Sequence, residues 1–215
     1  MTMIRAVAAW YRRIVPEPLR RAIRGRLSRG FYSRAFFDRL DQQQGPSYDV
    51  IAATIVDRFH PASVIDVGSG SGALLAALAR RGVPALAGLE SSGAGLERSR
   101  RRGMNVRACD LSQPFHLDGF DLAVCLEVAE HLPPQVADQF AACLASGPDI
   151  LVFSAATPGQ GGENHVNEQP HQYWIERLGR HGFTVDEELT SRVRVEWSEL
   201  GAAPWYCRNV IFFRR

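Results

Sequence analysis

The sequence contains no lysine, and all 25 basic residues of the 215-residue chain are arginines. This absence excludes chemistry on a lysine Schiff base and phosphate sites of the Walker type. The four cysteines, Cys109, Cys125, Cys143 and Cys207, include no C-x-x-C pair. We therefore expect reduced thiols rather than a zinc site or a disulfide framework. No apolar run approaches the roughly 18 residues that a membrane span requires.

Signals for disorder and for export are also lacking. Hydrophobic residues make up 46% of the chain and the net charge is only +2, which excludes disorder of the whole chain. The short apolar stretch between Arg5 and Arg12 is a poor signal peptide. The sequence therefore predicts a cytoplasmic protein, with peripheral attachment to a membrane left open.

The positive charge that is present is concentrated at one end. Residues 1–40 hold ten arginines against Glu17 and Asp38, a local charge of +8, whereas the rest of the chain carries −6. We interpret 1–45 as a basic helical cap of two short amphipathic helices. The cap could be a lid over a binding pocket, a contact with a membrane surface or a lipid-linked substrate, or a contact with nucleic acid. No RNA-binding signature accompanies the arginines, which argues against the last.

Short apolar runs alternate with helical patterns between residues 60 and 185. Such alternation is typical of βαβ units, in which helices cover both faces of a parallel sheet. We predict an α/β fold: a doubly wound, mostly parallel, Rossmann-like sheet of seven strands with an antiparallel hairpin at the C-terminal end. The predicted strands are 63–67, 85–89, 106–109, 120–126 and 150–154, and the hairpin pairs 193–197 with 210–212. The predicted helices are 48–59, 73–81, 93–102, 134–145 and 173–181, and a loop is predicted over 41–47.

The strongest motif is VIDVGSGSGALL, residues 64–75, in which an apolar strand leads into a glycine-rich turn and a helix. Glycines allow the backbone to approach a ligand closely, and the helix N-terminus favours an anionic group. The spacing G-x-G-x-G differs from the G-x-G-x-x-G of dinucleotide sites. Acids at the ends of the next two strands could hold ribose hydroxyls and an adenine amino group. The predicted cofactor-binding residues are Asp66, Gly68, Ser69, Gly70, Gly72, Glu90, Ser91, Asp110 and Leu111.

These segments, together with FDLAVCLEVAEHL at 120–132, resemble the class I S-adenosylmethionine (SAM) methyltransferases. The resemblance implies that 46–215 is a SAM-dependent methyltransferase domain. It further implies that 66–72 surrounds the methionine part of SAM, that Glu90 binds the ribose, and that Asp110 and Leu111 lie near the adenine.

A second group of polar residues follows the fourth and fifth predicted strands. Glu127, Glu130 and His131 form an E-x-x-E-H motif, and His165 follows in a glycine-rich loop. Two carboxylates and two imidazoles can hold Mg²⁺ or Mn²⁺. The set resembles the metal site of ubiquinone-pathway O-methyltransferases and of small-RNA 2′-O-methyltransferases. Without a metal, His131 is the candidate base, and the carboxylates would brace the loops; Glu127, Glu130 and His131 are the predicted catalytic residues.

The sequence thus predicts a methyltransferase acting on the oxygen of a small molecule, such as a sugar or a phenolic natural product. The alternatives are an RNA 2′-O-methyltransferase, a non-catalytic SAM-binding module and, least favoured, a dehydrogenase. Tyr173 and Trp174 either line the acceptor pocket or pack in the core.

Overall fold

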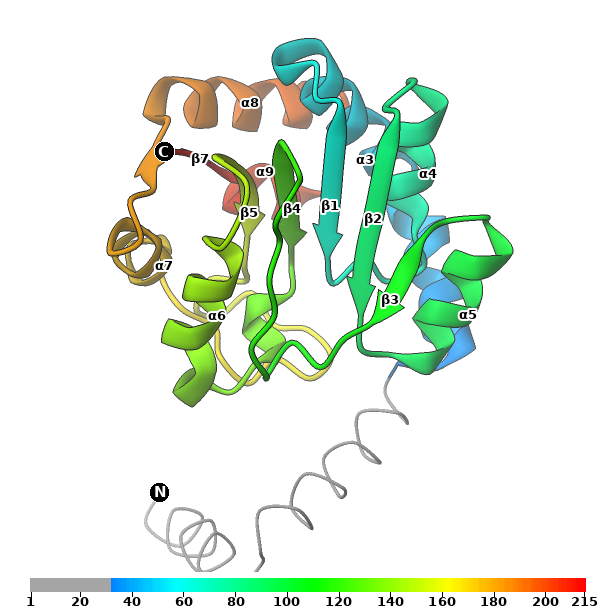
Figure 1. Ribbon diagram of the computed structural model, residues 1–215, viewed down its shortest axis with the longest axis horizontal. Helices are drawn as coiled ribbons and strands as arrows, with labels where there is room; N and C mark the ends of the chain where they lie inside the picture. The colour runs from blue at the N-terminus through cyan, green and yellow to red at the C-terminus, as the bar shows by residue number, and fades with distance from the viewer. Residues whose placement is uncertain (1–31) are drawn as a thin grey trace, which may run out of the picture.

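The computed structural model describes residues 32–215, which form one seven-stranded sheet with strand order β3-β2-β1-β4-β5-β7-β6 (Figure 1). Strands β1 to β5 pair in parallel, and β7 lies antiparallel to both β5 and β6. The predicted α/β fold, with seven strands and an antiparallel pair at the C-terminal end, is confirmed. The strands are β1 (Ser63–Val67), β2 (Ala85–Glu90), β3 (Val106–Ala108), β4 (Leu122–Leu126), β5 (Ile150–Ser154), β6 (Thr184–Val185) and β7 (Ile211–Arg214).

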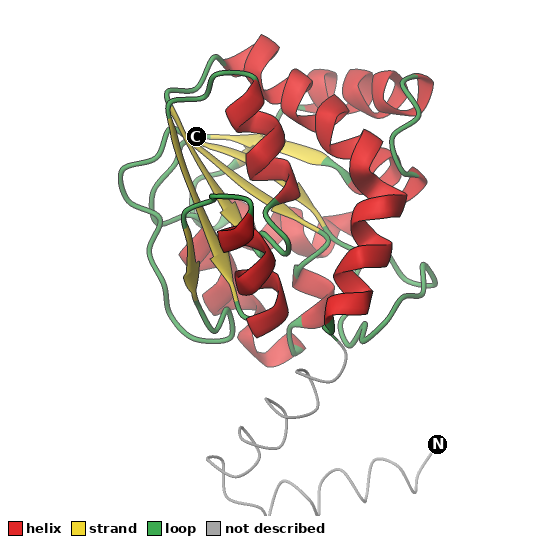
Figure 2. Ribbon diagram, turned by 90° about the vertical axis from the view of Figure 1, so that its right-hand side faces the viewer, coloured by secondary structure: helices red, strands yellow, loops and turns green. Residues whose placement is uncertain are grey.

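Helices cover both sides of this sheet (Figure 2). They are α3 (Arg34–Phe59), α4 (Ala73–Arg80), α5 (Gly93–Arg101), α6 (Ala137–Leu144), α7 (His171–Gly179), α8 (Glu187–Glu199) and α9 (Pro204–Asn209), with two 3₁₀ turns, η1 (Ala129–His131) and η2 (Pro134–Val136). The helices predicted from residue 73 onward agree with α4, α5, α6 and α7 to within a few residues.

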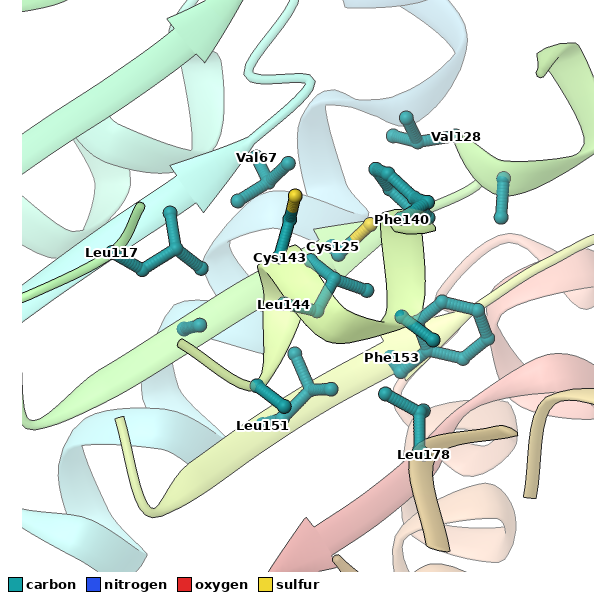
Figure 3. Packing of buried hydrophobic residues seen from close by; sticks show 14 of the residues in the cluster. Val67, Leu117, Cys125, Val128, Phe140, Cys143, Leu144, Leu151, Phe153 and Leu178 are labelled. Carbon is teal, nitrogen blue, oxygen red and sulfur yellow. The ribbon is translucent and has the colours of Figure 1, made fainter. Parts of the chain in front are cut away.

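The core lies on both faces of the sheet because side chains alternate along each strand. In β4, Ala123 and Cys125 belong to the cluster that includes Phe140 (Figure 3). Leu122 and Val124 belong to the cluster on the other face, which includes residues of α3, α4, α8 and α9. Strands buried on both faces leave only their carboxyl ends free to build a site.

The loop predicted over 41–47 is wrong, because α3 runs through it without a break. Glycine and proline in this segment signalled a turn. Buried polar contacts nevertheless hold the helix: Gln44 accepts a hydrogen bond from the Tyr206 hydroxyl (2.8 Å), and Ser47 accepts one from the Ala203 N–H (2.9 Å). Tertiary contacts thus outweigh the local helix-breaking signal.

The first strand of the predicted hairpin is also wrong, since 193–197 lies in α8. Val193 and Trp197 are buried on one face of this helix, whereas Val195 is 58% exposed. Three alternating residues fit a strand, but the i, i+4 spacing of the outer two fits a helix equally well. The strand that pairs with β7 is instead the two-residue β6, in which Val185 lies opposite Phe213.

The end of the basic cap, predicted at residue 45, falls inside α3. Most of that cap, including its two predicted arginine-rich helices, lies in residues 1–31, outside the described residues. In the described part, 32–215, no helix combines the length and the apolar character needed to cross a membrane.

Candidate active site

A cavity of about 590 Å³ lies between the carboxyl ends of β1, β2 and β4 and the first half of α3. Gly72 does not line it; this residue precedes α4 with a left-handed φ of 73°. The other twelve predicted site residues all line the cavity. These are Asp66, Gly68, Ser69, Gly70, Glu90, Ser91, Asp110, Leu111, Glu127, Glu130, His131 and His165.

The glycine-rich turn is fixed by its own backbone. The N–H groups of Gly68 and Ser69 both donate to the carbonyl of Leu89, at 2.8 and 3.0 Å. Gly68 has a φ of 79°, and a Cβ there would lie 2.4 Å from Val128 Cγ2. Only glycine fits this combination of left-handed backbone and close contact. The turn therefore brings bare backbone to the cavity.

Two buried acids flank the turn. Glu90 is 6% exposed and accepts hydrogen bonds from the N–H groups of Gly70 (2.8 Å) and Ser92 (2.6 Å). Burial raises the pKa of Glu90, although these backbone donors oppose the shift. Burial, reinforced by the charge of Glu90, also raises the pKa of Asp66 to about 7. This end of the cavity is therefore suited to a ligand with positive charge and hydroxyl donors.

Glu130, His131 and His165 converge at the other end of the cavity, and one ligand atom from each lies within 4.8 Å of the others. Glu130 and His131 belong to η1, directly after β4. The loop that carries His165 is fastened to this turn because the N–H groups of Val166 and Asn167 both donate to the carbonyl of Glu130 (2.9 and 3.0 Å). The backbone thus holds together residues that are 34 positions apart in the sequence.

The Glu130 side chain is 0% exposed, and neither of its oxygens makes a hydrogen bond of ordinary geometry, although the N–H of Ala156 and the Glu127 carboxylate approach it. Burial, followed by the charge of Glu127, raises the pKa of Glu130 well above its usual value. A buried carboxylate with such weak support is costly unless a proton or a cation balances it. This carboxylate beside two imidazoles fits a divalent cation.

Both imidazoles are oriented through Nδ1. The His131 Nδ1 lies 3.2 Å from the carbonyl of Asn164, and the His165 Nδ1 lies 2.9 Å from Glu168 Oε1. Burial lowers the pKa of His131 to about 4, so the ring is neutral at pH 7. In a neutral ring that donates from Nδ1, the free lone pair is on Nε2. Carboxylate and carbonyl partners of this kind are typical of metal-binding histidines.

Glu127 does not join this group of three. Its oxygens accept hydrogen bonds from Gln160 Nε2 (2.7 Å) and Asn209 Nδ2 (3.1 Å) instead. The predicted four-residue set therefore divides into three convergent residues and a fourth beside them. No sequence motif marks Gln160 or Asn209 as part of the site, nor Glu168 as the partner of His165. The one available signal was the acid three positions after His165.

The start of α3 and the residues before it cover the cavity. The Tyr32 ring lies edge-on to His131, with 5.8 Å between centroids, and Asn164 Nδ2 approaches the Tyr32 hydroxyl at 3.5 Å. Arg39 forms an ion pair with Glu163 at 3.0 Å. This described part of the N-terminal region therefore lies over the end of the cavity that carries His131 and His165.

The sequence profile of the methyltransferase domain family matches residues 26–192. The chain belongs to this family. It is also 29% identical over 120 residues to the ubiquinone biosynthesis O-methyltransferase of Neisseria meningitidis serogroup A, a match that covers 51% of this chain and 46% of that protein. The chain thus spans about half the length of the curated relatives that it matches.

Solved methyltransferases share the fold. The magnesium protoporphyrin IX methyltransferase of Synechocystis PCC 6803, with S-adenosylhomocysteine (SAH) bound, superposes with a TM-score of 0.64 at 17% identity, over 88% of this chain and 98% of that one. A small-RNA methyltransferase superposes with a TM-score of 0.57 at 21% identity, over 79% and 26% of the two chains. The family match identifies the chain as a methyltransferase domain, and these structures show that it shares the fold of SAM-dependent methyltransferases.

The residues of this methyltransferase fit SAM. SAM carries a sulfonium and an ammonium group, and two buried acids, Asp66 and Glu90, line the cavity. Ser69 Oγ is buried without a hydrogen-bond partner among the described residues, which leaves a polar atom for a ligand. The N–H groups of Gly68 and Ser69 already donate to Leu89, so at this turn the ligand would meet glycine backbone without a side chain rather than free donors.

Neither Tyr173 nor Trp174 of the methyltransferase lines the cavity. Trp174 is buried in the core and packs against Phe153, with 5.5 Å between ring centroids. Tyr173 is partly buried at the edge of the same cluster. Of the two roles considered for this pair, core packing is correct. The tyrosine, phenylalanine and tryptophan residues that line the cavity come from α3, the segment just before it and α9, and include Trp205.

Proposed function

We propose that the protein is an O-methyltransferase that uses a divalent cation to bind and activate a small-molecule acceptor. In this proposal, 66–72 surrounds the methionine part of SAM, Glu90 accepts from the ribose hydroxyls, and Asp110 with Leu111 lies near the adenine. Ser91 supports the ribose side. The Asp110 carboxylate is already oriented by the Ser112 N–H (3.1 Å), which supports its use as an acceptor at a fixed position.

The observation that carries the proposal is the buried carboxylate of Glu130, which lacks a hydrogen bond of ordinary geometry and lies within 4.8 Å of ligand atoms of His131 and His165. We assign these three residues as cation ligands and Glu127 as a fourth. Carboxylate and imidazole donors suit Mg²⁺ or Mn²⁺. When bound, the cation would lower the pKa of an acceptor hydroxyl and orient it.

The chain supplies position as well as charge. Methyl transfer is an in-line displacement, so holding the acceptor oxygen opposite the leaving sulfur supplies a large part of the acceleration. Tyr32 and the Arg39–Glu163 ion pair cover the cavity and would limit the entry of water. In a metal-free alternative, His131 Nε2 would accept the hydroxyl proton, because its ring is neutral at pH 7.

A small acceptor is favoured over RNA by the state of the arginines. RNA binding requires basic side chains free to neutralise phosphates. On the described surface, Arg80 is paired with Asp49 and Arg101 with Glu97. The cavity is also lined by six carboxylates, which would repel a polyanion.

The test is a calorimetric titration of the purified chain with SAH and with Mn²⁺, after treatment with a chelator. We expect one Mn²⁺ per chain, and no measurable Mn²⁺ binding by Glu130→Gln with SAH binding retained. Methyl transfer from labelled SAM to panels of phenols, sugars and oligonucleotides should require Mg²⁺ or Mn²⁺ and favour the small acceptors. Activity that persists in the chelator, or transfer to oligonucleotides alone, would refute the proposal.

A further inference from the structure

Glu127 is held by side-chain amides that the methyltransferase motifs do not include. Its backbone has a left-handed φ of 53°, and its N–H donates to the carbonyl of Ser154 (3.0 Å). Gln160 Nε2 donates to Oε2 at 2.7 Å, and Asn209 Nδ2 donates to Oε1 at 3.1 Å. Each carboxylate oxygen therefore has its own donor, one from the loop after β5 and one from the end of α9.

Asn209 also determines which way Gln160 faces. Its Nδ2 donates to Gln160 Oε1 at 2.7 Å, which leaves Gln160 Nε2 directed to Glu127. The Asn209 side chain is 0% exposed, and the His171 imidazole approaches its Oδ1. Its Nδ2 makes the two hydrogen bonds of ordinary geometry, so Glu127 and Gln160 determine how the amide is oriented.

The two amides act at the edge of the cation cluster. Glu127 is close enough to Glu130 for its charge to contribute to the raised pKa of that residue. It nevertheless lies outside the group formed by Glu130, His131 and His165. Because the two hydrogen bonds of ordinary geometry at the Glu127 carboxylate come from Gln160 and Asn209, these amides determine where the carboxylate lies relative to the cluster.

We propose that Asn209 is a positioning residue for the cation site. Through its hydrogen bonds to Glu127 and Gln160, it fixes the Glu127 carboxylate beside the other three ligands, ready to complete the coordination. The inference rests on the proposed function, because it requires that the cluster binds a cation. Partners of metal ligands commonly change metal affinity by about 10–100-fold when they are removed.

The experiment measures Mn²⁺ affinity from the electron paramagnetic resonance signal of the free ion, using the full chain without SAM. Asn209→Leu keeps the number and branching of the side-chain heavy atoms and removes the donor, and we expect its Mn²⁺ affinity to fall about 10–100-fold. SAH affinity should remain within about twofold of the wild type. The matched control is Thr54→Val, which removes a buried partner of Trp197 Nε1 (2.8 Å) at a residue that does not line the cavity. That variant should lose stability without losing Mn²⁺ affinity.

A double-mutant cycle identifies the route of the effect. If Asn209 acts through Glu127, then Asn209→Leu should have almost no further effect on Mn²⁺ affinity in the Glu127→Gln background. Additive effects would overturn the inference, and so would unchanged affinity in Asn209→Leu. Should Asn209→Leu fail to fold, Gln160→Leu removes the second donor and is expected to weaken Mn²⁺ similarly. A wild-type chain that binds no Mn²⁺ would defeat the proposed function and this inference together, whereas normal binding in the variants defeats only the inference.

Discussion

The two ends of the cavity treat a buried glutamate in opposite ways. Glu90 lies at the end of β2 and Glu130 lies in the turn after β4, and both are at most 6% exposed. Glu90 receives hydrogen bonds from the N–H groups of Gly70 and Ser92. Glu130 receives none of ordinary geometry. The backbone therefore stabilises the charge of one glutamate and leaves the other without such support.

The difference separates a preformed site from one that needs a partner. Hydrogen bonds to a charged group contribute about 1.5–3 kcal/mol, whereas a buried charge without partners is destabilising by a similar amount or more. The end of the cavity that carries Asp66 and Glu90, which we propose binds SAM and call the SAM end, is thus held in place by the chain alone. The cluster of Glu130, His131 and His165 is expected to be complete only with a cation or a proton bound.

The most direct way to break this comparison is to remove the two charges in turn. Without metal, Glu130→Gln should raise the free energy of unfolding by about 1–3 kcal/mol at pH 8, because folding of the wild type there requires Glu130 either to take up a proton or to bury a charge. Glu90→Gln should raise it by at least about 1 kcal/mol less, because it also removes a buried acid with a raised pKa but leaves one backbone N–H without its acceptor. Urea denaturation in chelator at pH 8 measures both. Equal changes in the two variants would show that the two glutamates are not opposed.

A smaller loss of stability is expected from adding a side chain to the glycine-rich turn. In Gly68→Ala the backbone would keep a left-handed φ, and the added Cβ would lie 2.4 Å from Val128 Cγ2. We expect it to be about 2 kcal/mol more destabilising than Gly82→Ala, because strain and overpacking add. Gly82 is the matched control, since it has a φ of 85° and nothing within 4 Å of its Cβ. Thermal unfolding and SAH titration provide the measurements, and equal losses in the two variants would contradict the close approach.

The third buried acid of the cavity, Asp66, gives a smaller effect that depends on pH. Burial and the charge of Glu90 raise its pKa to about 7. Its unfolded pKa is near 3.9. Between about pH 4 and 7 the folded chain holds a proton that the unfolded chain has released, so stability falls as pH rises through this window. Asp66→Asn should remove about 1–2 kcal/mol of that fall. Unfolding free energies at pH 5 and pH 8 test it; an unchanged difference between the two would show that Asp66 does not titrate there.

The sequence predicts the SAM end better than the cation end because the former is local. The segment from Asp66 to Gly72 is a strand, a turn and a helix start in contiguous residues, and the acids after β2 and β3 follow from strand order. The cation end depends on a loop folding back over 34 residues, so the pairing of His165 with Glu168 and the diversion of Glu127 to Asn209 could not be predicted. The wrong loop prediction over 41–47 has a similar cause, because tertiary contacts of α3 outweigh the glycine and proline that locally favour a turn.

The smallest expected effect concerns the ion pair between α3 and the loop that carries His165. Arg39 of α3 meets Glu163 of the cation-end loop at 3.0 Å, and both side chains are 54% exposed. Exposed pairs contribute about 0.2–1 kcal/mol, so Arg39→Ala should lower the free energy of unfolding by less than about 0.5 kcal/mol. If the ion pair serves only to keep α3 closed over the cavity, Arg39→Ala should release SAH faster. Its Mn²⁺ affinity should stay constant. Stopped-flow displacement of SAH at low and high salt measures this, and an equal change in both ligands would mean that the pair supports the whole cavity rather than its cover.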